Sequence, residues 1–293
     1  MIVFDQVTKT FPNGDTVLKN LNFSVTPGEF VVISGPSGAG KTTVGRLLIR
    51  ELSPTSGVIT VDKEDISKIT DKKLPSLRRK IGTVFQDYKI INDKTVYENI
   101  ALSLEIASFA EDQISDKVSY LLGQMGISGK EHLFPGQLSG GELQRAALAR
   151  AIAAEPHILF ADEPTGNLDK GTSKEIYDLL KKINQSGTTV VMATHDENMI
   201  NSDKHHHVHL EKGKITLNEG QKAKPKKKDK EKDKEKDKVE DKKDKEDKKE
   251  PEKKVEEIKK EEKVETVIDI DIDQEIKAGK KKKIKKKKRF GFI

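Results

Sequence analysis

The chain has 293 residues, with 55 Lys and Arg against 49 Asp and Glu and a formal net charge of +6. It has no cysteine, which excludes a disulfide framework and a cysteine-based zinc site. No apolar run approaches the ~20 residues of a transmembrane helix, and the first residues lack the features of a signal peptide, so we expect no membrane crossing by this chain.

Charge is distributed unevenly along the chain. Residues 222–289 hold 30 of the Lys and Arg residues and 21 of the Asp and Glu residues, a net charge of +9 that leaves −3 for the residues before them. The basic balance therefore belongs to this segment. It does not indicate nucleic-acid binding by the preceding part.

Strand and helix patterns alternate over the first 220 residues. Residues 1 to about 34 are expected to form strands, ending in the buried run "FVVIS". Further strands are predicted at 55–62, 80–87, 157–164 and 188–196, and helices at 42–52, 96–106, 114–125, 140–154 and 172–185. Alternation of this kind predicts an α/β core with a parallel sheet. The mainly helical stretch from about 89 to 153 indicates an inserted helical subdomain.

A glycine-rich loop follows the "FVVIS" strand and matches G-x-x-x-x-G-K-[ST] at every fixed position. Its residues are Gly35, Pro36, Ser37, Gly38, Ala39, Gly40, Lys41 and Thr42. Backbone N–H groups of such a loop point at phosphate oxygens, and the following helix adds its positive end. We expect Lys41 to reach the β- and γ-phosphates and Thr42 to ligate Mg²⁺. A plain glycine turn is the less favoured alternative.

Two acids end the apolar run "HILFADEP". Asp162 at the tip of a parallel strand beside a phosphate loop is expected to hold Mg²⁺. Glu163 is expected to act as general base on the attacking water.

The stretch "HHHVH" at 205–209 is open to two interpretations. Alternating His side chains on a strand are able to bind a metal ion. We favour a solvated strand edge.

These motifs, in this order, resemble the nucleotide-binding subunits of ABC ATPases over roughly residues 1–218. "GPSGAGKT" resembles the Walker A loop, "ILFADE" Walker B, "LSGGE" at 138–142 the ABC signature and "GNLD" at 166–169 the D-loop. The resemblance implies a P-loop NTPase fold with a RecA-like parallel-sheet core, a small antiparallel β subdomain and the inserted helical subdomain, in a domain spanning 1–220.

The resemblance also implies roles for individual residues. Gln86 would contact Mg²⁺ or water, His195 would contact the γ-phosphate, and Asp169 would help form a dimer face. Phe11 stands where the family places an aromatic ring against adenine. Thr43 joins the nucleotide-binding set, as do Ser139, Gly140, Gly141 and Glu142.

The chain has a second glycine-rich helix start, at residues 139–141, besides the one at the phosphate loop. The resemblance to the ABC signature gives it a role. Ser139, Gly140 and Gly141 open a helix whose N–H groups form a second anion site. In the family, ATP lies between the phosphate loop of one subunit and the signature of the other, so one copy of each motif implies a homodimer. An ordinary Ser-capped helix start with Glu142 in its first turn is the alternative.

Within ABC ATPases, "RRKIGTVFQDYKIINDKTVYENIALSLEI" most resembles the FtsE family of cell-division ATPases. That resemblance implies an integral membrane partner, FtsX-like, and a place at the cytoplasmic face of the membrane. Lipoprotein-release and macrolide-export ATPases share much of the pattern and remain the alternative. A soluble nucleic-acid-associated ABC ATPase is less favoured.

Residues 221–293 are expected to be a disordered tail, because their Lys, Asp and Glu content leaves little apolar surface to bury. Residues 222–263 are interpreted as a solvated spacer, and "VIDIDID" at 267–273 as a possible added edge strand. Residues 280–289 hold nine Lys and Arg and precede "FGFI". We expect this segment to bind an anionic membrane surface, with nucleic acid as the rival.

Overall fold

The computed structural model describes residues 2–200 and 205–220. The described residues belong to one unit. The predicted tail, its edge strand and its basic segment lie outside the described residues. The predicted domain boundary at residue 220 stays a prediction.

A four-stranded antiparallel sheet has the order β2-β1-β4-β5. Its strands are β1 (Ile2–Thr10), β2 (Thr16–Val25), β4 (Ser56–Val61) and β5 (Glu64–Asp65). Phe4 and Phe23 stack at 4.6 Å between ring centroids across the β1–β2 pair. This sheet is the small antiparallel β part that the family resemblance implied.

A six-stranded sheet has the order β10-β9-β3-β8-β7-β6. Its strands are β3 (Phe30–Ser34), β6 (Ile81–Val84), β7 (Ile158–Asp162), β8 (Thr189–Thr194), β9 (His206–Glu211) and β10 (Lys214–Glu219). All neighbours pair in parallel except β9 and β10. The carboxyl ends of β3, β6, β7 and β8 therefore meet at one edge, where ligands bind in sheets of this kind.

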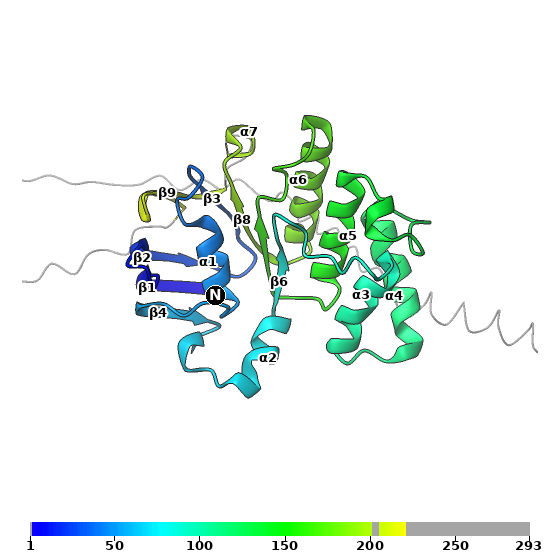
Figure 1. Cartoon of the computed structure of the whole chain (residues 1–293), viewed down its shortest axis with the longest axis horizontal. Helices are drawn as coiled ribbons and strands as arrows, with labels where there is room; N and C mark the ends of the chain where they lie inside the picture. The colour runs from blue at the N-terminus through cyan, green and yellow to red at the C-terminus, as the bar shows by residue number, and fades with distance from the viewer. Residues whose placement is uncertain (1, 201–204, 221–293) are drawn as a thin grey trace, which may run out of the picture. The chain divides into compact units, whose positions relative to one another are not determined.

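The helices lie on both sides of this sheet (Figure 1). They are α1 (Lys41–Leu48), α2 (Leu74–Arg79), α3 (Val96–Ile106), α4 (Glu111–Gln124), α5 (Gly140–Ile152), α6 (Lys170–Gln185) and α7 (Glu197–Ile200). Three short 3₁₀ helices, at Ile66–Lys68, Asp71–Lys73 and Pro135–Gln137, complete the set among the described residues. Helices α3, α4 and α5 fall in the stretch predicted to be helical. Helix α2 was not predicted, because six residues with a proline at the start give little periodic signal.

Two apolar clusters cover the two faces of the parallel sheet. Val31, Ile33, Phe160 and Val191 belong to the cluster shared with α1 and the antiparallel sheet. Their strand neighbours, such as Val32 and Leu159, belong to the cluster shared with α3 to α6. Because side chains alternate along a strand, both faces of β3 and β7 are buried, which explains their continuous apolar runs.

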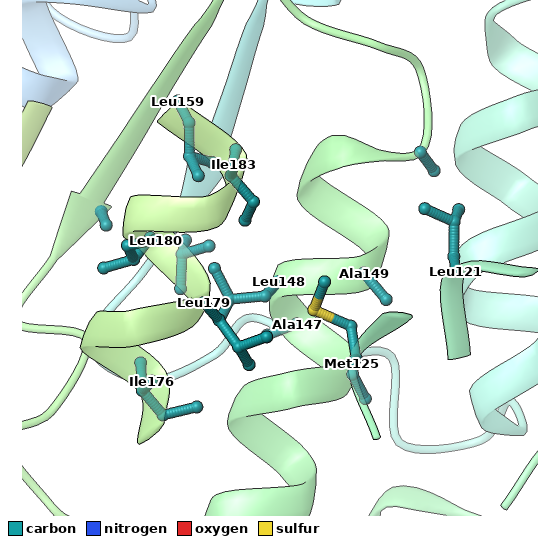
Figure 2. Packing of buried hydrophobic residues seen from close by; sticks show 14 of the residues in the cluster. Leu121, Met125, Ala147, Leu148, Ala149, Leu159, Ile176, Leu179, Leu180 and Ile183 are labelled. Carbon is teal, nitrogen blue, oxygen red and sulfur yellow. The ribbon is translucent and has the colours of Figure 1, made fainter. Parts of the chain in front are cut away.

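Helix α5 packs directly on α6. Figure 2 shows Leu148 and Ala147 of α5 beside Leu179 and Leu180 of α6. Met125, next to the end of α4, lies beside Ala147 and Ala149. Helix α5, which begins with the signature, is thus held between α6 and the inserted helices.

The interpretation of residues 205–209 as a solvated strand edge is wrong. Strand β9 lies between β10 and β3, so it is an inner strand. The His206 side chain is 2% exposed, and its ring nitrogens hydrogen-bond Glu29 Oε1 and Asn218 Oδ1, both at 2.7 Å. Strand β10, which was not among the predicted strands, pairs with the edge of β9 opposite β3.

His207 and His209 are also engaged. His207 Nε2 lies 2.6 Å and His209 Nδ1 2.7 Å from the Ser34 hydroxyl. Within residues 2–200 and 205–220, no group of three or more His, Cys, Asp or Glu side chains is arranged to hold a metal ion. In the same residues, no helix is long and apolar enough to cross a bilayer.

Candidate active site

The phosphate loop curls between β3 and α1. Gly40 adopts a left-handed φ of 107°, and a Cβ there would lie 2.5 Å from Leu18 Cδ2 of β2. Glycine is therefore required both by conformation and by close packing. Helix α1 starts at Lys41 with no side-chain cap, which leaves its first N–H groups directed toward the loop's mouth.

Lys41 lies across its own loop. Its Nζ donates to Gly35 O at 2.8 Å and to Pro36 O at 3.3 Å, and it pairs with Glu163 Oε1 at 3.1 Å. The residue is only 6% exposed. The ammonium group is thus already positioned in the loop, with its charge balanced by a carboxylate that ATP phosphates would have to displace.

Glu163 connects the ends of β7 and β8. It follows β7, its N–H donates to Ala193 O of β8 at 2.8 Å, and its Oε2 lies 2.8 Å from His195 Nδ1. Its φ of 48° lies in the left-handed region, which a residue with a Cβ adopts only at a cost. That conformation turns the carboxylate back between Lys41 and His195, where a general base would face the terminal phosphate.

Asp162 is buried at the tip of β7. It hydrogen-bonds Thr42, and its Oδ1 is buried without any hydrogen-bond partner. Burial, the largest cause, raises the pKa of this carboxyl, and the neighbouring Glu163 charge raises it further. A buried, unsatisfied carboxylate oxygen beside a threonine hydroxyl fits a Mg²⁺ ligand set.

Gln86 lies two residues beyond β6 at the same edge of the sheet, and its side chain is exposed. Phe11 lies in the turn between β1 and β2, half-buried, with Lys9 Nζ 5.4 Å from its ring centroid. Thr43 is half-buried in the first turn of α1. The nucleotide-binding roles of Gln86, Phe11 and Thr43 stay predictions.

The signature forms a capped helix start. The Ser139 hydroxyl accepts from Glu142 N at 3.4 Å, and Glu142 Oε2 accepts from Ser139 N at 2.9 Å, which is a capping box. The Ser139 backbone bond, followed by its hydroxyl and Lys130, lowers the pKa of Glu142 to about 2. The alternative interpretation of "LSGGE", a Ser-capped helix start with Glu142 in its first turn, is therefore confirmed, while the predicted anion site stays a prediction.

Gly141 allows α5 to approach α6. A Cβ on Gly141 would lie 2.6 Å from Thr172 Cγ2. Asp169, predicted to form part of a dimer face, caps α6 by accepting from Gly171 N at 2.9 Å and Thr172 Oγ1 at 2.6 Å. The D-loop and the signature are thus neighbours within one chain.

The structure brings together Lys41, Thr42, Asp162, Glu163 and His195. Among the residues that it describes, no hydrogen bond or ion pair joins Ser139, Gly140, Gly141 or Glu142 to the phosphate loop. Beside Glu163 and His195 opens a groove of about 710 Å³, bordered by Thr165, Lys174 and Asp196. A second cavity of about 740 Å³ lies beside Glu29 and His206, at the start of β3, and is remote from these groups.

Two residues at the site had no role in the sequence analysis. Asn99 and Arg150 bond the backbone of the segment after Gln86. Asn99 falls within the stretch that resembles the FtsE family, where it was given no role, and Arg150 falls outside every quoted motif; only their contacts reveal what they do.

Comparison with known proteins agrees with this geometry. The family profile described as "ABC transporter" matches residues 18–166. The cell division ATP-binding protein FtsE of Mycobacterium tuberculosis is 45% identical over 220 residues, 75% of this chain and 96% of that protein. FtsE of Bacillus subtilis is 43% identical over 221 residues, 75% of this chain and 97% of that protein.

Among solved structures, the dimeric structure of MJ0796, a bacterial ABC transporter cassette, superposes with a TM-score of 0.69 at 35% identity. It covers 75% of this chain and 98% of that chain. A second dimeric structure of MJ0796, bound to ADP and Pi in a post-hydrolysis state, gives a TM-score of 0.68. With its phosphate loop, paired acids and signature in the family's order, the chain belongs to the ABC transporter family as an ATP-hydrolysing cassette.

Proposed function

We propose that this chain is the ATP-hydrolysing subunit of a cell-division complex, working as an FtsE-like homodimer bound to an FtsX-like membrane protein at the cytoplasmic face of the membrane. The observation that carries the proposal is the Lys41–Glu163–His195 cluster at the strand ends, within a chain similar to FtsE over 75% of its length. No observation favours the lipoprotein-release or macrolide-export alternative.

Each group of the cluster has a chemical part in hydrolysis. Backbone N–H groups of the loop and Lys41 bind the phosphates, and their positive charge stabilises the charge that develops on the transferred group. Glu163 accepts a proton from the attacking water. His195, held by Glu163 through Nδ1, is left with Nε2 to contact the γ-phosphate.

Mg²⁺ fits the residues present. Thr42 and the unsatisfied Oδ1 of Asp162 would hold it, and Gln86, two residues beyond β6, would contribute a further ligand. When bound, the ion neutralises phosphate charge.

A homodimer accounts for the signature's position. Because Ser139 to Glu142 make no described polar contact with their own phosphate loop, the signature of one chain is free to complete the site of another. The N–H groups that open α5 suit the γ-phosphate. MJ0796, similar in sequence and fold, is dimeric in its solved structures.

Replacing Glu163 by Gln tests the proposal. The amide cannot act as base, and it also removes the ion pair with Lys41 at 3.1 Å. We expect turnover of Mg-ATP to fall by at least about a hundredfold, while ATP binds more tightly and holds a dimer detectable by light scattering. Glu211→Gln, an exposed acid at the end of β9, is the matched control. A Glu163→Gln protein that stays monomeric in Mg-ATP at every concentration would remove the dimer from the proposal.

The basic segment supports a membrane location by a separate route. Nine Lys and Arg within residues 280–289 would each contribute about 1 kcal/mol near an anionic leaflet. Flotation with phosphatidylglycerol vesicles should recover the full chain but not a chain truncated after residue 279. Equal recovery of both in anionic vesicles would exclude this contact and leave the ATPase unaffected.

A further inference from the structure

The segment that follows Gln86 adopts a strained turn. Tyr88 and Lys89 have φ angles of 59° and 48°, so two consecutive residues with a Cβ lie in the left-handed region. Tyr88 N–H donates to Phe85 O at 2.9 Å and Lys89 N–H to Asp87 O at 2.6 Å. Residues of this kind rarely adopt such angles without support from their surroundings.

Arg150 supplies that support from the last turn of α5. Its Nη2 donates to Tyr88 O at 2.9 Å and its Nη1 to Lys89 O at 2.7 Å. In the described part of the chain it forms no ion pair with a carboxylate, and burial lowers its pKa. The guanidinium group therefore serves the carbonyls of the two strained residues, in a planar geometry that Lys does not reproduce.

A second side chain holds the far end of the same segment. Asn99 of α3, 2% exposed, accepts from Ile91 N at 2.9 Å and donates to Ile91 O at 3.0 Å. The segment thus begins at the end of β6, is bonded to α5 at Tyr88 and Lys89, and is bonded to α3 at Ile91. Gln86 lies at the junction.

Helix α5 links this junction to the signature. Ser139 caps its first turn, and a Cβ on Gly140 would lie 4.0 Å from the Tyr88 hydroxyl. Arg150 stands in its last turn. The last turn of this 13-residue helix thus bonds the Gln86 segment through Arg150, and its first turn, which carries the signature, lies near the Tyr88 hydroxyl.

We infer that Arg150 is a positioning residue, which holds Gln86 in place by fixing the strained turn and joins that turn to the signature helix. The inference rests on the proposed function, in which Gln86 contacts Mg²⁺ or water at its own chain's phosphate loop and Ser139 contacts the ATP bound by the partner chain. In that dimer the two residues serve different ATP sites, so Arg150 would link one site to the other.

Arg150→Lys tests this role and keeps the charge. It leaves at most one of the two carbonyls bonded, and we expect the KM for ATP to rise about tenfold, the effect of losing one charge-assisted hydrogen bond. Arg78→Lys is the matched control. Arg78 donates to Ile49 O at 3.2 Å and Arg50 O at 3.4 Å, and Arg50 also has a left-handed φ of 52°. Both variants should lower the melting temperature similarly, but only Arg150→Lys should alter the KM.

A rescue separates positioning from general stability. Lys89 is exposed, and glycine adopts its left-handed angle without steric cost. Lys89→Gly alone should leave turnover unchanged, and in the Arg150→Lys background it should return the KM to within about threefold of the parent value.

Equal KM values in Arg150→Lys and Arg78→Lys would overturn the inference, as would a double variant no better than Arg150→Lys. Either result, obtained with a wild-type protein that hydrolyses Mg-ATP, leaves the proposed function standing. A wild-type protein without Mg-ATP turnover would overturn both.

Discussion

The contact between the signature helix and α6 gives the sharpest prediction. Gly141→Ala would place a Cβ 2.6 Å from Thr172 Cγ2, a methyl group on a stiff β-branched side chain. Overpacking of this kind costs about 1–3 kcal/mol, against which alanine in a helix gains up to about 1 kcal/mol over glycine. We expect the single variant to be destabilised.

In a Thr172→Ser background, we expect Gly141→Ala to stabilise the protein instead of destabilising it. Serine removes Cγ2 but keeps the hydroxyl that donates to Asp169 Oδ2 at 2.6 Å, and the next atoms, Thr172 Cβ and Oγ1, both lie 3.9 Å from the built Cβ. In this background Gly141→Ala should gain stability from helix propensity alone, by up to about 1 kcal/mol. The interaction energy between the two changes should therefore be about 1–3 kcal/mol.

Urea unfolding of nucleotide-free protein measures the free energy of unfolding of the parent, the two single variants and the double variant. Using nucleotide-free protein separates packing from any effect on ATP contacts. Additive effects, with an interaction below about 0.5 kcal/mol, would refute the claim that glycine is required at position 141 by the close approach of α6.

Three further predictions follow from single side chains. Glu142→Ala should destabilise the protein at neutral pH. Because folding lowers the Glu142 pKa from 4.5 to about 2, the contribution of this carboxylate to the free energy of unfolding is complete above pH 4.5 and should vanish as pH falls toward 2. Unfolding curves of both proteins from pH 7 to 2 would check this. Asp162→Asn should raise the melting temperature in EDTA, because burial raises the pKa of the carboxyl and so disfavours its charged form, yet it should abolish the stabilisation by Mg-ATP; a lower melting temperature in EDTA would contradict the assignment. His206→Ala should cost about 1–3 kcal/mol of unfolding free energy, since it leaves Glu29 and Asn218 without their buried partner, whereas His157→Ala, at an imidazole 69% exposed, should change little.

Much of the fold was accessible from pattern alone. The runs at β3, β7 and β8 are apolar without interruption because both faces of each strand are buried, and α3 spans the same residues in the structure as in the prediction. The phosphate loop and Asp162–Glu163 were recognisable because each is a short local motif tied to a strand end. The position of β9 could not be predicted, because a strand becomes an inner strand only when it pairs on both sides. Its second neighbour, β10, was not among the predicted strands.

The sequence by itself determined the chemical groups of the site: a glycine-rich phosphate loop with its lysine, two acids and a serine-capped helix start. Each could be recognised because its residues are adjacent in the sequence. The tertiary structure decided how these parts act on one another. The pairing of Lys41 with Glu163 and the clamp of Arg150 on Tyr88 and Lys89 join residues more than 60 apart in sequence. Such contacts depend on strand order and helix packing, and those are set by burial of the whole chain and not by any local pattern.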